Sequence, residues 1–150
     1  MPSLEQAKQY LDQLDLSYIK KKMCAEHYPM PRWQSELADV GEKLYKRYLW
    51  LLVKYPDQHL VPTRDIDEFW HNHILYTQRY TEDCEALFGR YIHHHPSDPD
   101  DNEDMTNITK QFQLTQKLYQ QEFGENLQIL KRYQQFPRGT AEKITASHPS

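Results

Sequence analysis

The feature that most constrains the fold is a run of apolar residues that recurs at helical spacing between residues 33 and 52. One face stays apolar over about five turns, through Trp33, Leu37, Val40, Leu44, Tyr48 and Leu51. The chain has only four glycines and no sustained alternating runs, so little in it favours a β-sheet. We therefore expect an all-α protein that contains one long helix over this run.

The length and composition favour a single folded domain. A chain of 150 residues has room for one core, and its aromatic content of 13% is too high for a disordered chain. The net charge of −4 argues against a general nucleic-acid or anionic-membrane binder. No apolar run approaches the ~18 residues of a spanning helix. Two cysteines are too few for a disulfide framework, so we expect a cytoplasmic protein, with a secreted effector as the alternative.

Further helices are expected on both sides of the long one. Ser3 and Gln6 have the spacing of a capping box, which predicts a helix start. A short second helix is expected over residues 16–24. Another helix should begin at Thr63 or Asp65 and keep one face through Tyr80. We expect Thr81 to cap a short continuation that ends at Gly89, a typical C-terminal signal.

The C-terminal third combines a loop, a helix and a tail. The acidic stretch over residues 97–104 has no apolar period, so we expect a solvated loop, followed by a last long helix capped by Thr106. Gly124 interrupts that helix, and Leu127, Leu130 and Tyr133 extend its pattern. The prediction is a compact bundle of five or six helices over residues 1–136, with an acidic loop before the last long helix and a disordered tail over 137–150.

Histidines give the chain its chemical character. There are eight, and five of them lie between positions 71 and 95. Asp67 and His71 are four residues apart, so a helix places them one turn apart on the same side. A carboxylate in that position can share a metal with the imidazole, or accept its N–H and fix its tautomer. His73 points about 200° away from His71, toward the apolar face, so it has a different role unless the helix is distorted.

A second group of histidines follows the expected helix end at Gly89. His93, His94 and His95 are consecutive, and a loop can turn neighbouring side chains toward one point. Folded back over the helix, they would add imidazole ligands to Asp67 and His71. Such a set suits a divalent transition metal, with zinc first and copper, nickel or iron as alternatives. The same residues could equally form a structural polar network, and adjacent histidines can bind metal incidentally.

Cys84 offers a different chemistry, because cysteine with histidine and aspartate forms known catalytic sets. The neighbouring carboxylate of Asp83 would raise the pKa of the thiol, which disfavours a nucleophile. A buried structural cysteine is the better interpretation. A hydrolase or transferase based on Cys84 and a histidine is therefore only a third hypothesis.

At this segment the sequence resembles the bacterial members of the glycine-rich domain-containing protein-like family, which is also represented in plants. The resemblance covers about residues 15–96. It rests on Val61-Pro62, Asp65-Ile66-Asp67, Trp70-His71-Asn72-His73, Tyr80, Asp83-Cys84, Phe88-Gly89-Arg90, His93-His94 and Pro96. The family is largely uncharacterised, so the resemblance implies a domain identity and no reaction. The candidate site residues that it implies are Asp67, Trp70, His71, His73, Tyr80, Asp83, Cys84, His93 and His94.

The sequence thus predicts a small helical domain with a metal site built from Asp67, His71, His73, His93 and His94. If the site is catalytic, metal-assisted chemistry is the natural class, because two histidines and a carboxylate leave positions open for water or substrate. Whether the protein is an enzyme stays open. The alternative is a protein-interaction module in which these residues form a polar network and the last helix or the acidic loop binds a protein partner.

Overall fold

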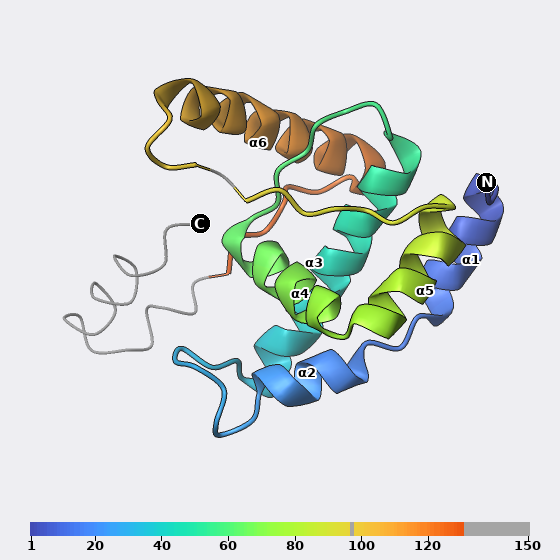
Figure 1. The fold of residues 1–150 in the computed structure, drawn as a ribbon, viewed down its shortest axis with the longest axis vertical. Coiled ribbons are helices and arrows are strands. Elements are labelled where there is room, and N and C mark those ends of the chain that lie inside the picture. Colours follow the sequence, from blue (N-terminus) through green and yellow to red (C-terminus); the bar gives the residue numbers. More distant parts are fainter. Residues whose placement is uncertain (97, 131–150) are drawn as a thin grey trace.

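The computed structural model describes residues 1–96 and 98–130, and this part of the chain is all-α, as predicted (Figure 1). The helices are α1 (Leu4–Gln13), α2 (Ser17–Met23), α3 (Ser35–Lys54), α4 (Arg64–Leu75), α5 (Thr77–Phe88) and α6 (Asn102–Phe123). Across these ranges no helix is both long and apolar enough to cross a membrane. The predicted tail over 137–150 and the last residues of the predicted 1–136 domain lie outside the described residues.

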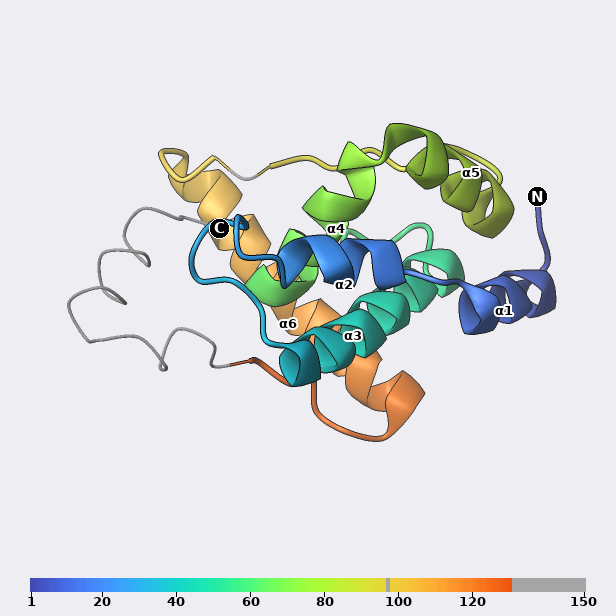
Figure 2. The same cartoon turned by 90° about the horizontal axis from the view of Figure 1, so that it is seen from below.

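The long helix that the sequence predicts is α3, and it is the centre of the bundle. It packs against α1, α2, α4 and α6, as Figures 1 and 2 show. Its inner face buries Leu44, Tyr45, Tyr48 and Leu51 almost completely. Burying large apolar side chains stabilises a fold by roughly 1.5–3 kcal/mol each. The apolar period therefore explains both the helix and its central place.

Gly41 allows α3 and α4 to approach each other closely. A Cβ at this position would lie 2.6 Å from Cε2 of Phe69 and 2.8 Å from Cζ3 of Trp33. Those two rings meet edge to face, with their centroids 5.3 Å apart. Any side chain at position 41 would overlap these two rings, and at least one of them would have to shift. Because α4 carries Asp67 and His71, this contact also sets the position of the candidate site.

The expectation of one helix running through Tyr80 is wrong. The backbone leaves the helical region at Tyr76, with φ −87° and ψ 70°, so α4 ends at Leu75 and α5 begins at Thr77. Thr81 lies inside α5 and bonds back to the carbonyl of Thr77, so it caps nothing. The bend lets α5 pack against both α1 and α4. The left-handed backbone of Gly89, with φ 69°, ends α5 as predicted.

The last helix also differs from its prediction at both ends. α6 starts at Asn102 because the side chain of Asp101 accepts the backbone N–H groups of Glu103 and Asp104. Part of the predicted acidic loop is therefore helical, and Thr106 lies inside the helix. The helix ends at Gly124, whose φ is 71°. Leu127 and Leu130 lie beyond the end of the helix and are buried. Their apolar character therefore reflects packing against the core and not a continuation of α6. Tyr133 lies outside the described residues.

The Gly41 contact gives a direct test of the packing. Gly41→Ala should lower the free energy of unfolding by about 1–3 kcal/mol, because the new methyl group overlaps two buried aromatic rings. Urea unfolding followed by circular dichroism measures the change. Lys43→Ala, at an exposed position of the same helix, is the control and should stay within about 0.5 kcal/mol of the parent. A Gly41→Ala protein as stable as the parent would contradict the close approach of α3 and α4.

Candidate functional site

Three side chains that are distant in the sequence meet at one point. Asp67 and His71 come from α4, and His94 comes from the segment that follows α5. Each offers one ligand atom, and these atoms lie within 4.8 Å of one another. We call Asp67, His71 and His94 the Asp67 cluster.

The first two members are placed by the start of α4. Thr63 caps the helix by accepting the N–H of Ile66, which fixes where the first turn begins. Asp67 and His71 then follow one turn apart, and Nε2 of His71 lies 3.5 Å from Oδ2 of Asp67. Ligand atoms around a tetrahedral zinc ion stand about 3.3 Å apart, so this pair is already near the required spacing. The side chain of His71 is 55% exposed, which leaves this side of the cluster open to solvent.

His94 completes the cluster from the other side. Its Nε2 hydrogen-bonds to Oδ1 of Asp67, and its ring lies 4.6 Å from that of His71, centroid to centroid. The ring also packs against Trp70 in a T-shaped contact at 4.4 Å. Only 13% of the His94 side chain is exposed. His94 is therefore held between a carboxylate and an indole, with Asp67 bridging the two histidines.

The other two histidines of the run point elsewhere. Along residues 91–95 the side chains alternate between exposed and half-buried, as in an extended chain. His94 faces the protein, whereas His93 and His95 are exposed and lie with their ring centroids 6.4 Å apart. The geometry thus groups His94, and not His93, with Asp67 and His71.

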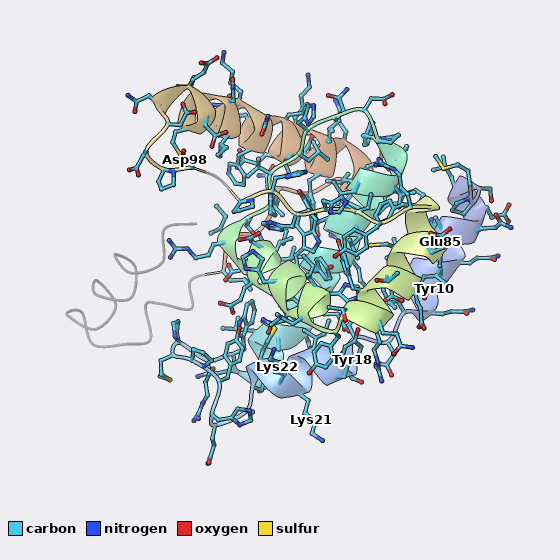
Figure 3. All side chains as sticks on the ribbon, viewed as in Figure 1. Tyr10, Tyr18, Lys21, Lys22, Glu85 and Asp98 are labelled. Carbon is cyan, nitrogen blue, oxygen red and sulfur yellow. The ribbon has the colours of Figure 1, made fainter. Side chains whose placement is uncertain are left out.

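His73 belongs to a separate group of buried residues. Its Nε2 lies 2.7 Å from Oδ2 of Asp83, and its Nδ1 lies 2.7 Å from the hydroxyl of Tyr45. Tyr10 donates its hydroxyl to the second oxygen of Asp83 at 2.6 Å, and Figure 3 shows Tyr10 on α1 beside α5. We call Tyr10, Tyr45, His73 and Asp83 the His73 network. Both ring nitrogens of His73 have partners, so His73 is not available as a metal ligand, and its inward direction agrees with the helical geometry.

Tyr10 and Tyr45 keep their hydroxyl protons in the His73 network. Burial raises the pKa of Tyr45 well above its ordinary value. Burial and then the hydrogen bond to Asp83 raise the pKa of Tyr10 in the same way. Both phenols therefore stay protonated at neutral pH and can donate hydrogen bonds.

Cys84 lies against this region without the features of a nucleophile. Its side chain is buried on α5, and burial raises the pKa of the thiol. Its thiol lies close to the hydroxyl of Tyr80 and to the backbone of Ile92. A protonated, enclosed thiol is a poor nucleophile. The structure therefore disfavours a hydrolase or transferase based on Cys84.

Several partners of these groups carry no signal in the sequence. Tyr10 and Tyr45 appear there only as apolar positions of two helices, and the hydrogen-bonding role of each depends on helices far away in the chain. The carbonyl of Ile92, which binds Tyr80, is likewise invisible in a pattern of side chains. Residues spaced one turn apart can be recognised in a sequence, but contacts between helices cannot.

The fold and the site together define a small all-α domain with a carboxylate and two imidazoles gathered at one point. The chain belongs to the UCP032817-like family, whose sequence model matches residues 6–128. Over 60 residues it is 35% identical to glycine-rich domain-containing protein 1 of Arabidopsis thaliana. That match covers 37% of this chain and 7% of the plant protein. No solved structure matches. The family-level resemblance seen in the sequence is thus supported, and it brings no reaction with it.

The His73 network should contribute strongly to stability. Asp83→Ala removes the acceptor of both Tyr10 and His73 and leaves buried polar groups unpaired, so we expect a loss of about 3–5 kcal/mol in the free energy of unfolding. Chemical denaturation measures it. Glu82→Ala, at the exposed neighbouring position, should change stability by less than about 0.5 kcal/mol. Equal stability of the two variants would show that the network does not hold the helices together.

The rate of thiol alkylation tests the interpretation that Cys84 is a buried structural cysteine. In the folded protein at neutral pH, iodoacetamide should alkylate Cys84 far more slowly than after denaturation, because the thiol is buried and protonated. Mass spectrometry of peptides over time gives the rate, and the half-buried Cys24 serves as the internal comparison. Rapid, selective modification of Cys84 in the native protein would revive the nucleophile hypothesis.

Proposed function

We propose that the Asp67 cluster binds one divalent transition metal, and that this metal centre is the functional site of the domain. The observation that carries the proposal is the meeting of two imidazole nitrogens and one carboxylate oxygen within 4.8 Å. Zinc is the first candidate, because it favours a small set of nitrogen and oxygen ligands. Two histidines and one carboxylate also suit iron(II), and copper and nickel accept the same donors.

Three protein ligands leave at least one coordination position for water or substrate. His71 is the exposed member, so solvent reaches the cluster on this side. A metal there would act as a Lewis acid and lower the pKa of bound water. If the domain is an enzyme, metal-assisted chemistry is the reaction class that the donor set supports.

The two cysteines are both unpaired, which supports the expectation of a reducing compartment such as the cytoplasm.

One observation favours a second candidate function. Nε2 of His94 already has a partner in Asp67 without any metal, so the cluster can join the 91–96 segment to α4 by hydrogen bonding alone. The domain would then be a protein-interaction module, with a protein partner bound through α6 or the acidic residues before it. The two functions differ in what happens at His94. A metal needs the lone pair of Nε2, whereas a polar network uses that nitrogen for the hydrogen bond with Asp67.

Metal analysis separates the two functions. Protein purified without a histidine tag should contain one equivalent of metal, or take up one equivalent of added zinc. His94→Ala and His71→Ala should each lose it. His93→Ala is the matched control, because that imidazole is adjacent in sequence and exposed on the other side of the segment. Binding of zinc should release protons and strengthen as the pH rises, because the ligand nitrogens must be deprotonated.

The possible outcomes discriminate clearly. Metal retained in His93→Ala and lost in His94→Ala would support the centre. No metal bound by the parent protein, either as purified or with added zinc, copper, nickel or iron(II), would refute it and leave the polar network. Equal loss in His93→Ala and His94→Ala would mean that the histidine run binds metal without the Asp67 cluster.

A further inference from the structure

Tyr80 connects α4, which carries Asp67 and His71, to the segment that carries His94, and it is not itself a member of the Asp67 cluster. Its side chain is 2% exposed, and its hydroxyl makes two hydrogen bonds of opposite sense. It accepts from Nε1 of Trp70 at 2.8 Å and donates to the carbonyl oxygen of Ile92 at 2.6 Å. One hydroxyl therefore joins α4 to the segment that carries His94.

Cys84 reinforces this junction from the next turn of α5. It lies four residues after Tyr80, on the same side of the helix, and its thiol is close to the backbone of Ile92. Tyr80 thus bonds to the backbone of Ile92, and Cys84 of the same helix lies close to it. We call Trp70, Tyr80 and Cys84, with the backbone of Ile92, the Ile92 anchor.

The anchor determines where His94 lies. His94 follows Ile92 by two residues, so in an extended chain it points to the same side of the backbone. Trp70 contributes twice, since its N–H binds Tyr80 and its ring packs against the ring of His94. With Ile92 fixed and the indole alongside, Nε2 of His94 falls beside Asp67.

We infer that Tyr80 is the positioning residue of the metal site: through Trp70 and Ile92 it places His94 for coordination, and so it controls the metal affinity. This inference rests on the proposed metal centre. It also gives a physical role to Trp70, Tyr80 and Cys84, none of which supplies a ligand to the cluster. Residues that orient metal ligands from outside the coordination shell typically change metal affinity by about 10–100-fold when they are replaced.

The test compares two buried tyrosines that each lose one hydroxyl. Tyr80→Phe breaks the link between Trp70 and Ile92. Tyr119→Phe, on α6, removes a hydroxyl that binds Arg47 and has no contact with the Asp67 cluster. Zinc affinity is measured by competition with a chromophoric chelator, and the coordination of added cobalt(II) is followed by its visible absorption.

Tyr80→Phe should weaken zinc binding by about 10–100-fold and alter the cobalt spectrum, whereas Tyr119→Phe should stay within about twofold of the parent. Helix content and the unfolding midpoint of each variant show that it is folded. If Tyr80→Phe does not fold, Cys84→Ala tests the other arm of the anchor and should also weaken zinc binding. Its failure to do so would then overturn the inference.

The results also distinguish the failure of the positioning role from the failure of the proposed metal centre. Unchanged affinity in folded Tyr80→Phe, or equal weakening in Tyr119→Phe, would overturn the positioning role while the metal centre stands. A parent protein that binds no metal would refute the metal centre itself, and the positioning role with it.

Discussion

The hydrogen bonds of His73 are the interactions on which the rest of the structure depends. His73 is 1% exposed, and a buried imidazole without partners would destabilise the fold by several kcal/mol. Its two nitrogens bind Tyr45 on α3 and Asp83 on α5, and Asp83 also binds Tyr10 on α1. Three helices, α1, α3 and α5, are therefore joined to α4, directly or through Asp83, by directional bonds in a low-dielectric interior. Apolar burial makes these helices pack, but the network specifies how they are oriented.

The site follows from this arrangement in a definite order. The His73 network fixes α5 against α4, and that brings Tyr80 within reach of Trp70. Tyr80 then binds the backbone after α5, and the chain that leaves Gly89 is directed back along α4. The contact between His94 and Asp67 therefore depends on all of these contacts. The Asp67 cluster thus depends on buried contacts that contribute no ligand.

Periodic patterns in the sequence predicted much of this and failed at identifiable places. The α3 face, the Ser3 cap, the pairing of Asp67 with His71 and the inward direction of His73 all follow from the 3.6-residue turn, and the structure has each of them. The break at Tyr76 was missed because an apolar face continues across it in sequence. The start of α6 was missed because Asp101 caps the helix within a stretch that has no apolar period.

The site was harder to predict than the fold, because it depends on contacts between segments. The sequence indicated that the histidine run could return to α4, but not which imidazole would reach Asp67. That choice depends on Tyr80 and the carbonyl of Ile92, and main-chain groups leave no trace in a pattern of residue types. His93 and His94 are chemically identical in the sequence, and only the anchor distinguishes them.

Because side chains alternate along residues 91–95, the number of residues between Ile92 and His94 decides which side of the chain each histidine faces. Side chains on an extended chain change sides with every residue, so inserting or deleting one residue between the two would turn an outward imidazole inward, or the reverse. Because three histidines are consecutive, the neighbour that turned inward after such a change would still present an imidazole to Asp67. A slip by one residue would exchange the ligand without changing its chemistry, and the triplet gives this connection a tolerance that a lone histidine would lack.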